Sequence, residues 1–304
     1  MYNMSYKLLF TLLFFSNMVL GQEHVAKKIR RLNYISREFS KSDLDSALYY
    51  ANTAKSLAIR HNITSLVDSS DVILLNVYYL TGNKNKFNQL LKKTQNKVDL
   101  NQFQDLTGFY KIRAQNETSD GLYLQAIETY RLGIASIPKP KQKKLKGDFI
   151  HDIAVIYKRM GKLPEALNLY NQALGLAIEN NDIVLQQYAL SGKGIIYKEL
   201  KQYENALSTY EKSLDLAYQA KDKISIADNY ANIATAYLDQ GQKEKALIFN
   251  KKVIKIREES GDIGLYYAIA INNTGVNFFE MNKLDSAEHY LSLIHISEPT
   301  RRPI

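Results

Sequence analysis

Residues 154–170 read AVIYKRMGKLPEALNLY, and this stretch contains the pattern that decides the fold. Five positions carry the pattern: Ala154, Tyr157, Gly161, Ala166 and Tyr170. A small residue followed three places later by an aromatic one lies on the same helix face, where the small residue lets a second helix approach closely. Gly161 predicts a turn, because glycine tolerates the left-handed conformation that ends a helix. Beyond the turn, alanine and tyrosine four places apart continue the apolar stripe on a second helix.

The same pattern recurs along the chain at a nearly constant step. The residues equivalent to Ala166 are Ala47, Phe87, Ala126, Ala166, Ala206, Ala246 and Ala287, at steps of 40, 39, 40, 40, 40 and 41 residues. The later units supply the remaining packing positions as Gly194, Tyr197, Ala206 and Tyr210, then Ala234, Tyr237, Gly241 and Ala246, then Gly275, Phe278 and Ala287. A fixed period of this length predicts a stacked repeat array, whereas the alternative, an ordinary helical bundle, has no need of one.

The helix-turn-helix unit and its packing positions resemble the tetratricopeptide repeat (TPR), in a form longer than the common 34-residue repeat. The resemblance implies an all-α fold, a right-handed superhelical solenoid of stacked helix-turn-helix repeats. It covers residues 22–290 in about seven repeats, at roughly 25–62, 63–100, 101–140, 144–182, 183–222, 223–262 and a truncated 263–290. It also implies a protein that holds a protein or peptide partner rather than one that performs chemistry.

The N-terminus predicts a signal peptide over residues 1–21. Lys7 precedes a mainly apolar stretch from Leu8 to Leu20, and the small residues Val19 and Gly21 suit a cleavage site. Thirteen residues are few for a membrane-spanning helix, although an uncleaved anchor is the alternative. The sequence therefore predicts an exported protein, periplasmic or otherwise extracytoplasmic. Because the chain has no cysteine, it has neither a lipid-carrying cysteine nor a disulfide framework.

The formal net charge of +9 does not indicate nucleic-acid binding. The basic clusters at residues 27–31 and 139–146 lack the interleaved aromatic residues of a nucleic-acid surface. The second cluster, with Pro138 and Pro140, predicts a solvated loop between the third and fourth repeats.

No catalytic motif, cofactor motif or metal-ligand spacing is present in the sequence, so we expect no enzymatic activity, no cofactor and no metal. Ser191-Gly192-Lys193-Gly194 looks like a phosphate-binding loop, but it falls inside a predicted first helix with Gly194 at the small packing position.

The resemblance places the first helix of each repeat on the concave side of the solenoid, where partners bind. Matching positions of the last four repeats supply the partner-binding candidates His151, Lys158, Tyr188, Lys198, Asp228 and Asn272. Such a mixed polar and aromatic face suits an extended peptide or a partner helix. Some family members clamp a C-terminal carboxylate with asparagines two places before the aromatic position. Here that place holds Val155, Ile195, Thr235 and Val276, so that clamp is not expected.

The C-terminal residues 291–304 begin LSLIHISEPTR, which resembles the translation of a transposon-end adapter used in sequencing libraries. We therefore expect these residues to be an artefact, poorly ordered, with the second helix of the last repeat cut after Tyr290. Phe278, Phe279 and Tyr290 would then lose their cover.

Two functions fit these expectations. The chain resembles the sensory front half of bacterial membrane regulators, in which a leader and a repeat array precede a membrane helix and a cytoplasmic module. Membrane attachment would then come from a missing C-terminal part. The alternative is a periplasmic or envelope-associated assembly scaffold without a signalling module.

Overall fold

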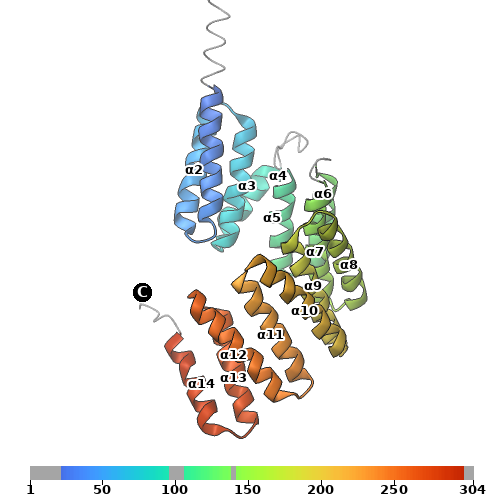
Figure 1. Ribbon diagram of the computed structural model, residues 1–304. Coiled ribbons are helices and arrows are strands. Elements are labelled where there is room, and N and C mark those ends of the chain that lie inside the picture. Colours follow the sequence, from blue (N-terminus) through green and yellow to red (C-terminus); the bar gives the residue numbers. More distant parts are fainter. Residues whose placement is uncertain (1–21, 96–105, 138–141, 298–304) are drawn as a thin grey trace, which may run out of the picture. The chain divides into compact units, whose positions relative to one another are not determined.

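The computed structural model describes residues 22–95, 106–137 and 142–297, and every regular element within them is helical (Figure 1). The chain divides into two compact units, Met1–Ile137 and Pro138–Ile304. The expected signal peptide, the loop at Pro138 and Pro140, and residues 298–304 lie outside the described residues.

The first unit consists of helix pairs that correspond to the first three repeats. Its helices are a helix over 22–39, α2 (Leu44–Arg60), α3 (Thr64–Leu80), α4 (Lys84–Gln95), α5 (Leu106–Ser119) and α6 (Tyr123–Ala135). Leu75, Phe87 and Phe109 are among the fully buried side chains of its core. A buried ion pair joins α2 to α3, where Lys55 Nζ lies 2.5 Å from Asp71 Oδ1.

The second unit contains the last four repeats, again as helix pairs. The first helices are α7 (Gln142–Arg159), α9 (Ile183–Glu199), α11 (Lys223–Asp239) and α13 (Leu265–Glu280). The second helices are α8 (Leu163–Glu179), α10 (Tyr203–Ala220), α12 (Lys243–Ser260) and α14 (Leu284–Ser297). Within α7 to α14, every two consecutive helices pack against each other, and α9 also contacts the first helices α7 and α11. This order is the stacking that the forty-residue period predicts.

The turns within the repeats use the left-handed backbone conformation. Gly161 and Gly241 have φ angles of 73° and 74°, and Asn282 has 57°. Lys201 takes the same conformation at 58°, although the fifth repeat has no glycine there. The seven residues that mark the period are at most 3% exposed. The side chain at this position is therefore enclosed between the two helices of each repeat.

Two glycines let α9 approach both of its neighbouring second helices. A Cβ on Gly194 would overlap the ring of Tyr210 in α10, and a Cβ on Gly192 would overlap the ring of Tyr170 in α8. Gly194 thus occupies the packing position that the sequence indicates. Gly192 allows the same close approach to Tyr170 of the preceding repeat, a contact between repeats that the pattern within one repeat does not predict.

The seventh repeat differs from expectation, because its second helix does not stop at Tyr290. Helix α14 continues to Ser297, so the expected end of the second helix after Tyr290 is wrong. Leu291 lies four residues after Ala287, the place that Tyr210 holds after Ala206, and it packs over Gly275, whose Cβ would be 2.7 Å from Leu291 Cδ2. The tail residue thereby completes the apolar stripe that every repeat needs.

The expected exposure at this end is correct only in part. Phe278 is 7% exposed and its ring stacks on Tyr290 with centroids 5.5 Å apart. Phe279 is 62% exposed, as the expectation requires. The expectation is therefore wrong for Phe278.

We predict that Gly194→Ala destabilises the second unit. The new methyl group would collide with the Tyr210 ring, which costs about 1–3 kcal/mol and outweighs the gain in helix propensity. Gly175→Ala in α8 is the matched control, because a Cβ there meets nothing within 4 Å, and it should stabilise by about 0.5–1 kcal/mol. Urea unfolding measures both changes. Equal effects of the two substitutions would contradict the packing role of Gly194.

We also predict that Tyr210→Phe maintains or raises stability at neutral pH and flattens its decline in alkali. Tyr210 is fully buried, and its hydroxyl has no hydrogen-bond partner among the described residues, so removing the hydroxyl breaks no hydrogen bond and should change stability by about 0–1 kcal/mol in favour of the folded state. Burial raises the pKa of Tyr210. A raised pKa in the folded state gives stability that is complete below about pH 10 and lost above it, as the unfolded tyrosine ionises.

Unfolding free energies between pH 8 and pH 12 test this prediction. Tyr34→Phe, at a 64% exposed site, serves as the control and should leave the pH profile unchanged. If the unfolding free energy of Tyr210→Phe fell more steeply with rising pH than that of the unchanged chain, the predicted effect of the buried hydroxyl would be wrong.

Candidate functional site

A groove of about 370 Å³ runs across three first helices of the second unit. Helix α9 contributes Gln187, Tyr188 and Ser191 to its walls, and α13 contributes Tyr266, Ile269 and Asn273. Helix α11 lies between them and contributes six residues from Ser225 to Thr235. The groove therefore follows the face on which the sequence places the partner-binding positions.

The structure brings two of the six predicted binding residues together in this groove, Tyr188 and Asp228. A third, His151 on α7, lies beside the groove, with its ring centroid 6.0 Å from that of Tyr188 and 5.5 Å from that of Tyr170. His151 thus supports Tyr188 from the preceding repeat.

The other three predicted residues lie elsewhere. Lys198 is engaged by the next repeat, with its Nζ 2.9 Å from Asp239 Oδ2. Lys158 is half-buried on α7, and neither lysine is among the residues that line the groove. Asn272 is exposed outside the groove, whereas the adjacent Asn273 lines it. The prediction for α13 is therefore displaced by one residue, because the inward-facing side of this helix is defined by its packing on α12 and α14.

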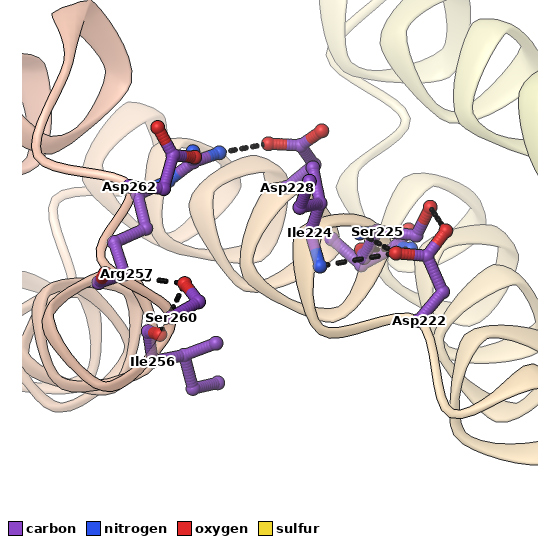
Figure 2. A network of polar contacts seen from close by, with 9 residues as sticks. Asp222, Ile224, Ser225, Asp228, Ile256, Arg257, Ser260 and Asp262 are labelled. Carbon is purple, nitrogen blue, oxygen red and sulfur yellow. Dashed lines mark hydrogen bonds and ion pairs between the residues drawn. The ribbon is translucent and has the colours of Figure 1, made fainter. Parts of the chain in front are cut away.

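A buried arginine on the second helix α12 reaches the edge of the groove. Arg257 is 2% exposed, and its guanidinium pairs with Asp228 on α11 and with Asp262 in the turn after α12 (Figure 2). The ring of Tyr266 lies over the same guanidinium, 5.1 Å from Arg257 Cζ to the ring centroid. Arg257 therefore contacts two residues of the groove, Asp228 and Tyr266, although it does not line the groove itself.

The extra residue of the last repeat explains how Asp262 becomes free for this contact. In the two preceding repeats the equivalent aspartates cap the next first helix. Asp182 accepts a hydrogen bond from the Leu185 amide, and Asp222 accepts from the amides of Ile224 and Ser225. Helix α13 begins two residues later relative to its aspartate, at Leu265, and its N-cap Gly264 supplies no side-chain cap. Asp262 can therefore turn to Arg257.

Burial raises the pKa of the Asp228 carboxyl, and the nearby charges of Asp222 and Asp262 raise it further, although Arg257 acts in the opposite direction. The guanidinium of Arg257 is shared by two carboxylates, those of Asp228 and Asp262. The carboxylate side chain of Asp228 remains half exposed at the groove.

Two buried amides on the groove walls have atoms without hydrogen-bond partners among the described residues. These atoms are Gln187 Nε2, a donor, and Asn229 Oδ1, an acceptor. The Nδ2 group of Asn229 donates to the Ser225 carbonyl at 2.8 Å, which fixes the amide so that Oδ1 is the unsatisfied atom. Because unsatisfied buried polar atoms are costly, such atoms mark positions where a ligand can supply the missing partner.

Arg257 could have been found in the sequence by comparing it with the residues at the same position of the preceding repeats. The residues forty and eighty places earlier, Ala217 and Ala177, are fully buried alanines on the second helices of the preceding repeats. An arginine in place of a buried alanine requires carboxylate partners nearby, because an unpaired buried charge is costly. Asp228 and Asp262 are those partners.

Within residues 22–95, 106–137 and 142–297, no group of histidine, cysteine, aspartate and glutamate side chains is arranged to hold a metal ion. The helices in these ranges also include none with both the length and the apolar character needed to cross a membrane.

We predict that Arg257→Gln lowers the stability of the second unit by about 1–3 kcal/mol, because it removes the charge that Asp228 and Asp262 share. The control is Arg131→Gln, which breaks an exposed pair with Glu128 at 3.7 Å and should change stability by less than about 0.5 kcal/mol. Thermal unfolding measures the loss of stability in Arg257→Gln and in Arg131→Gln. Indistinguishable melting temperatures would show that the Arg257 network carries no stability.

Family models of the tetratricopeptide repeat match residues 150–184 and residues 186–259. No curated protein matches the chain in sequence.

Solved structures resemble the chain in fold at low sequence identity. The apo form of RapI has a TM-score of 0.71 at 16% identity, over 92% of this chain and 77% of that one. A Rap protein complexed with the competence and sporulation factor has a TM-score of 0.64 at 17% identity, over 90% and 76%. A signal transduction ATPase from Pyrococcus horikoshii with a TPR sensor has a TM-score of 0.68 at 18% identity, over 88% of this chain and 41% of that one. The helix pairs, their period and the matched repeats together make this chain a tetratricopeptide repeat protein.

Proposed function

We propose that the chain is a protein-interaction module that binds an extended peptide segment along the first helices α9, α11 and α13. The observation that carries this proposal is the groove, since it is continuous over three repeats and lies on the side that first helices share. TPR repeats support a protein-binding scaffold, and the proposal assigns the chain binding rather than catalysis.

The chemistry of the groove supports a peptide as the ligand. Amide side chains such as Gln187, Asn229 and Asn273 can pair with peptide N–H and C=O groups, while Tyr188 and Ile269 offer apolar surface to side chains. One structural neighbour is a Rap protein in complex with the competence and sporulation factor, which is consistent with ligand binding by this fold.

Export and signalling form a second part of the proposal. The apolar leader at residues 8–20 supports secretion, and the resemblance to sensory regions of membrane regulators supports a role as the extracytoplasmic part of a signalling protein. The alternative is an envelope scaffold without a signalling module. A hydrophobic stretch of about 20 residues following the array in the complete open reading frame would favour the regulator, and a reading frame without one would favour the scaffold.

We predict that Tyr188→Ala combined with Ile269→Asp weakens peptide binding at least about tenfold, because both side chains line the groove. The measurement is binding of a degenerate fluorescent peptide library to the purified 304-residue chain. Ile248→Ala is the control, since Ile248 is 56% exposed but lies on the second helix α12. Equal loss in control and double variant, or no loss in either, would contradict groove binding.

We further predict that residues 1–30 export a fused alkaline phosphatase, which is active only outside the reducing cytosol. Replacing Leu12 and Leu13 by arginine in the same fusion should abolish the activity, because charges interrupt the apolar region that the export machinery recognises. A fusion that is inactive without this change would contradict export.

A further inference from the structure

We propose that the groove over α9, α11 and α13 selects peptide segments that carry a lysine or arginine side chain, and that this side chain pairs with Asp228 between Tyr188 and Tyr266. The inference rests on the proposed peptide-binding function and adds the chemical class of the ligand. It is carried by three features of the groove: its charge, its aromatic walls and an unsatisfied buried acceptor.

The charge of the groove comes from a single residue. Among the side chains that line it, Asp228 is the one that is ionised at neutral pH. Its Oδ1 atom pairs with Arg257 Nη2, while Oδ2 receives no hydrogen bond from a described residue, and Figure 2 shows it turned away from the guanidinium. The carboxylate is therefore held in place by one oxygen and can accept hydrogen bonds through the other.

Arg257 holds this carboxylate without neutralising the site. Its guanidinium is shared between Asp228 and Asp262, and the charge of Asp222 also acts on Asp228. Two carboxylates share one guanidinium, so this cluster keeps a net negative charge, which attracts a cation. A cationic ligand group would supply the charge that this cluster lacks.

The groove does not suit an anionic ligand, although an arginine lies close to it. The Arg257 side chain is 2% exposed and covered by Tyr266 and its two carboxylate partners. A ligand carboxylate could reach it only by displacing Asp228, and it would then meet the remaining negative charges.

Two tyrosines form walls that suit a cation. Tyr188 is 54% exposed and Tyr266 is 63% exposed, and both line the groove with Asp228. Each ring also contacts a residue that does not line the groove, Tyr188 the ring of His151 and Tyr266 the guanidinium of Arg257. Aromatic faces next to a carboxylate favour ammonium and guanidinium groups through cation–π contacts.

An independent observation points to a hydrogen-bond donor in the ligand. Asn229 is 2% exposed and lines the groove, and its Oδ1 has no partner among the described residues. This orphaned acceptor is on the residue next to Asp228. A lysine ammonium has three donors and an arginine guanidinium has five, so either group has donors beyond those that Asp228 can accept.

The experiment uses hexapeptide libraries that are degenerate at five positions and contain lysine, arginine, glutamate or norleucine at the sixth. Binding to the purified 304-residue chain is measured by fluorescence anisotropy at low and at physiological salt. We expect the lysine and arginine libraries to bind about tenfold more tightly than the norleucine library, and the glutamate library to bind most weakly. The preference should shrink as salt is added.

Three variants locate the preference. Asp228→Asn should reduce it to less than about twofold while norleucine peptides still bind, and Asp228→Glu should retain most of it. Asp262→Asn is the matched control, because Asp262 also pairs with Arg257 but does not line the groove. It should lower the preference less than Asp228→Asn does, because it removes one charge of the cluster but leaves the Asp228 carboxylate in the groove. Circular dichroism of each variant checks that it is folded.

Each outcome has a definite meaning. Peptide binding without a preference for basic residues, or a preference that survives Asp228→Asn, overturns the inference and leaves the proposed function standing. Equal loss in Asp228→Asn and Asp262→Asn also overturns it, since the effect would then come from Arg257. Absence of binding by every library overturns both the inference and peptide binding by this groove.

Discussion

The contact between a tyrosine ring on a second helix and a glycine on a first helix is the interaction on which the second unit depends. Tyr210 occupies the space beside Gly194, and Tyr170 occupies the space beside Gly192, so α9 can approach α10 and α8 at close range. Each ring fills the space that a Cβ would take, which replaces water by dense packing. The contact recurs as Leu291 on Gly275 in the last repeat, whereas the fourth and sixth repeats have the buried alanines Ala154 and Ala234 at the position of Gly194.

The groove is a consequence of this spacing. Once each helix packs on its neighbours in order, α9, α11 and α13 present equivalent faces next to one another, and residues forty places apart in the chain line one surface. The seventh repeat then departs from the others by one residue. That residue releases Asp262 from helix capping, and Arg257 replaces a buried alanine, so Asp228 on the middle helix of the groove is held by an arginine.

Much of this architecture could be predicted from the sequence, because the period identifies local packing positions that every repeat shares. Ala206, Gly194 and Gly241 have the same surroundings wherever the pattern recurs. The residues that escaped prediction depend on contacts between repeats or on departures from the period. Gly192 packs on the preceding repeat, Arg257 needs partners from two other segments, and Leu291 belongs to a tail whose resemblance to adapter sequence concealed its fit to the helix pattern. Of the predicted binding residues, Tyr188 and Asp228 share the groove, whereas Lys198 forms an ion pair with the next repeat.

The central claim is that the first helices of the second unit form one continuous binding surface. Hydrogen–deuterium exchange of the chain with and without a bound library peptide tests it most directly, because exchange reports on each helix separately. The account predicts slower exchange on binding in residues 186–191, 225–235 and 266–273, with second helices unchanged. Protection confined to the second helices α10, α12 and α14, or to the first unit, would contradict it.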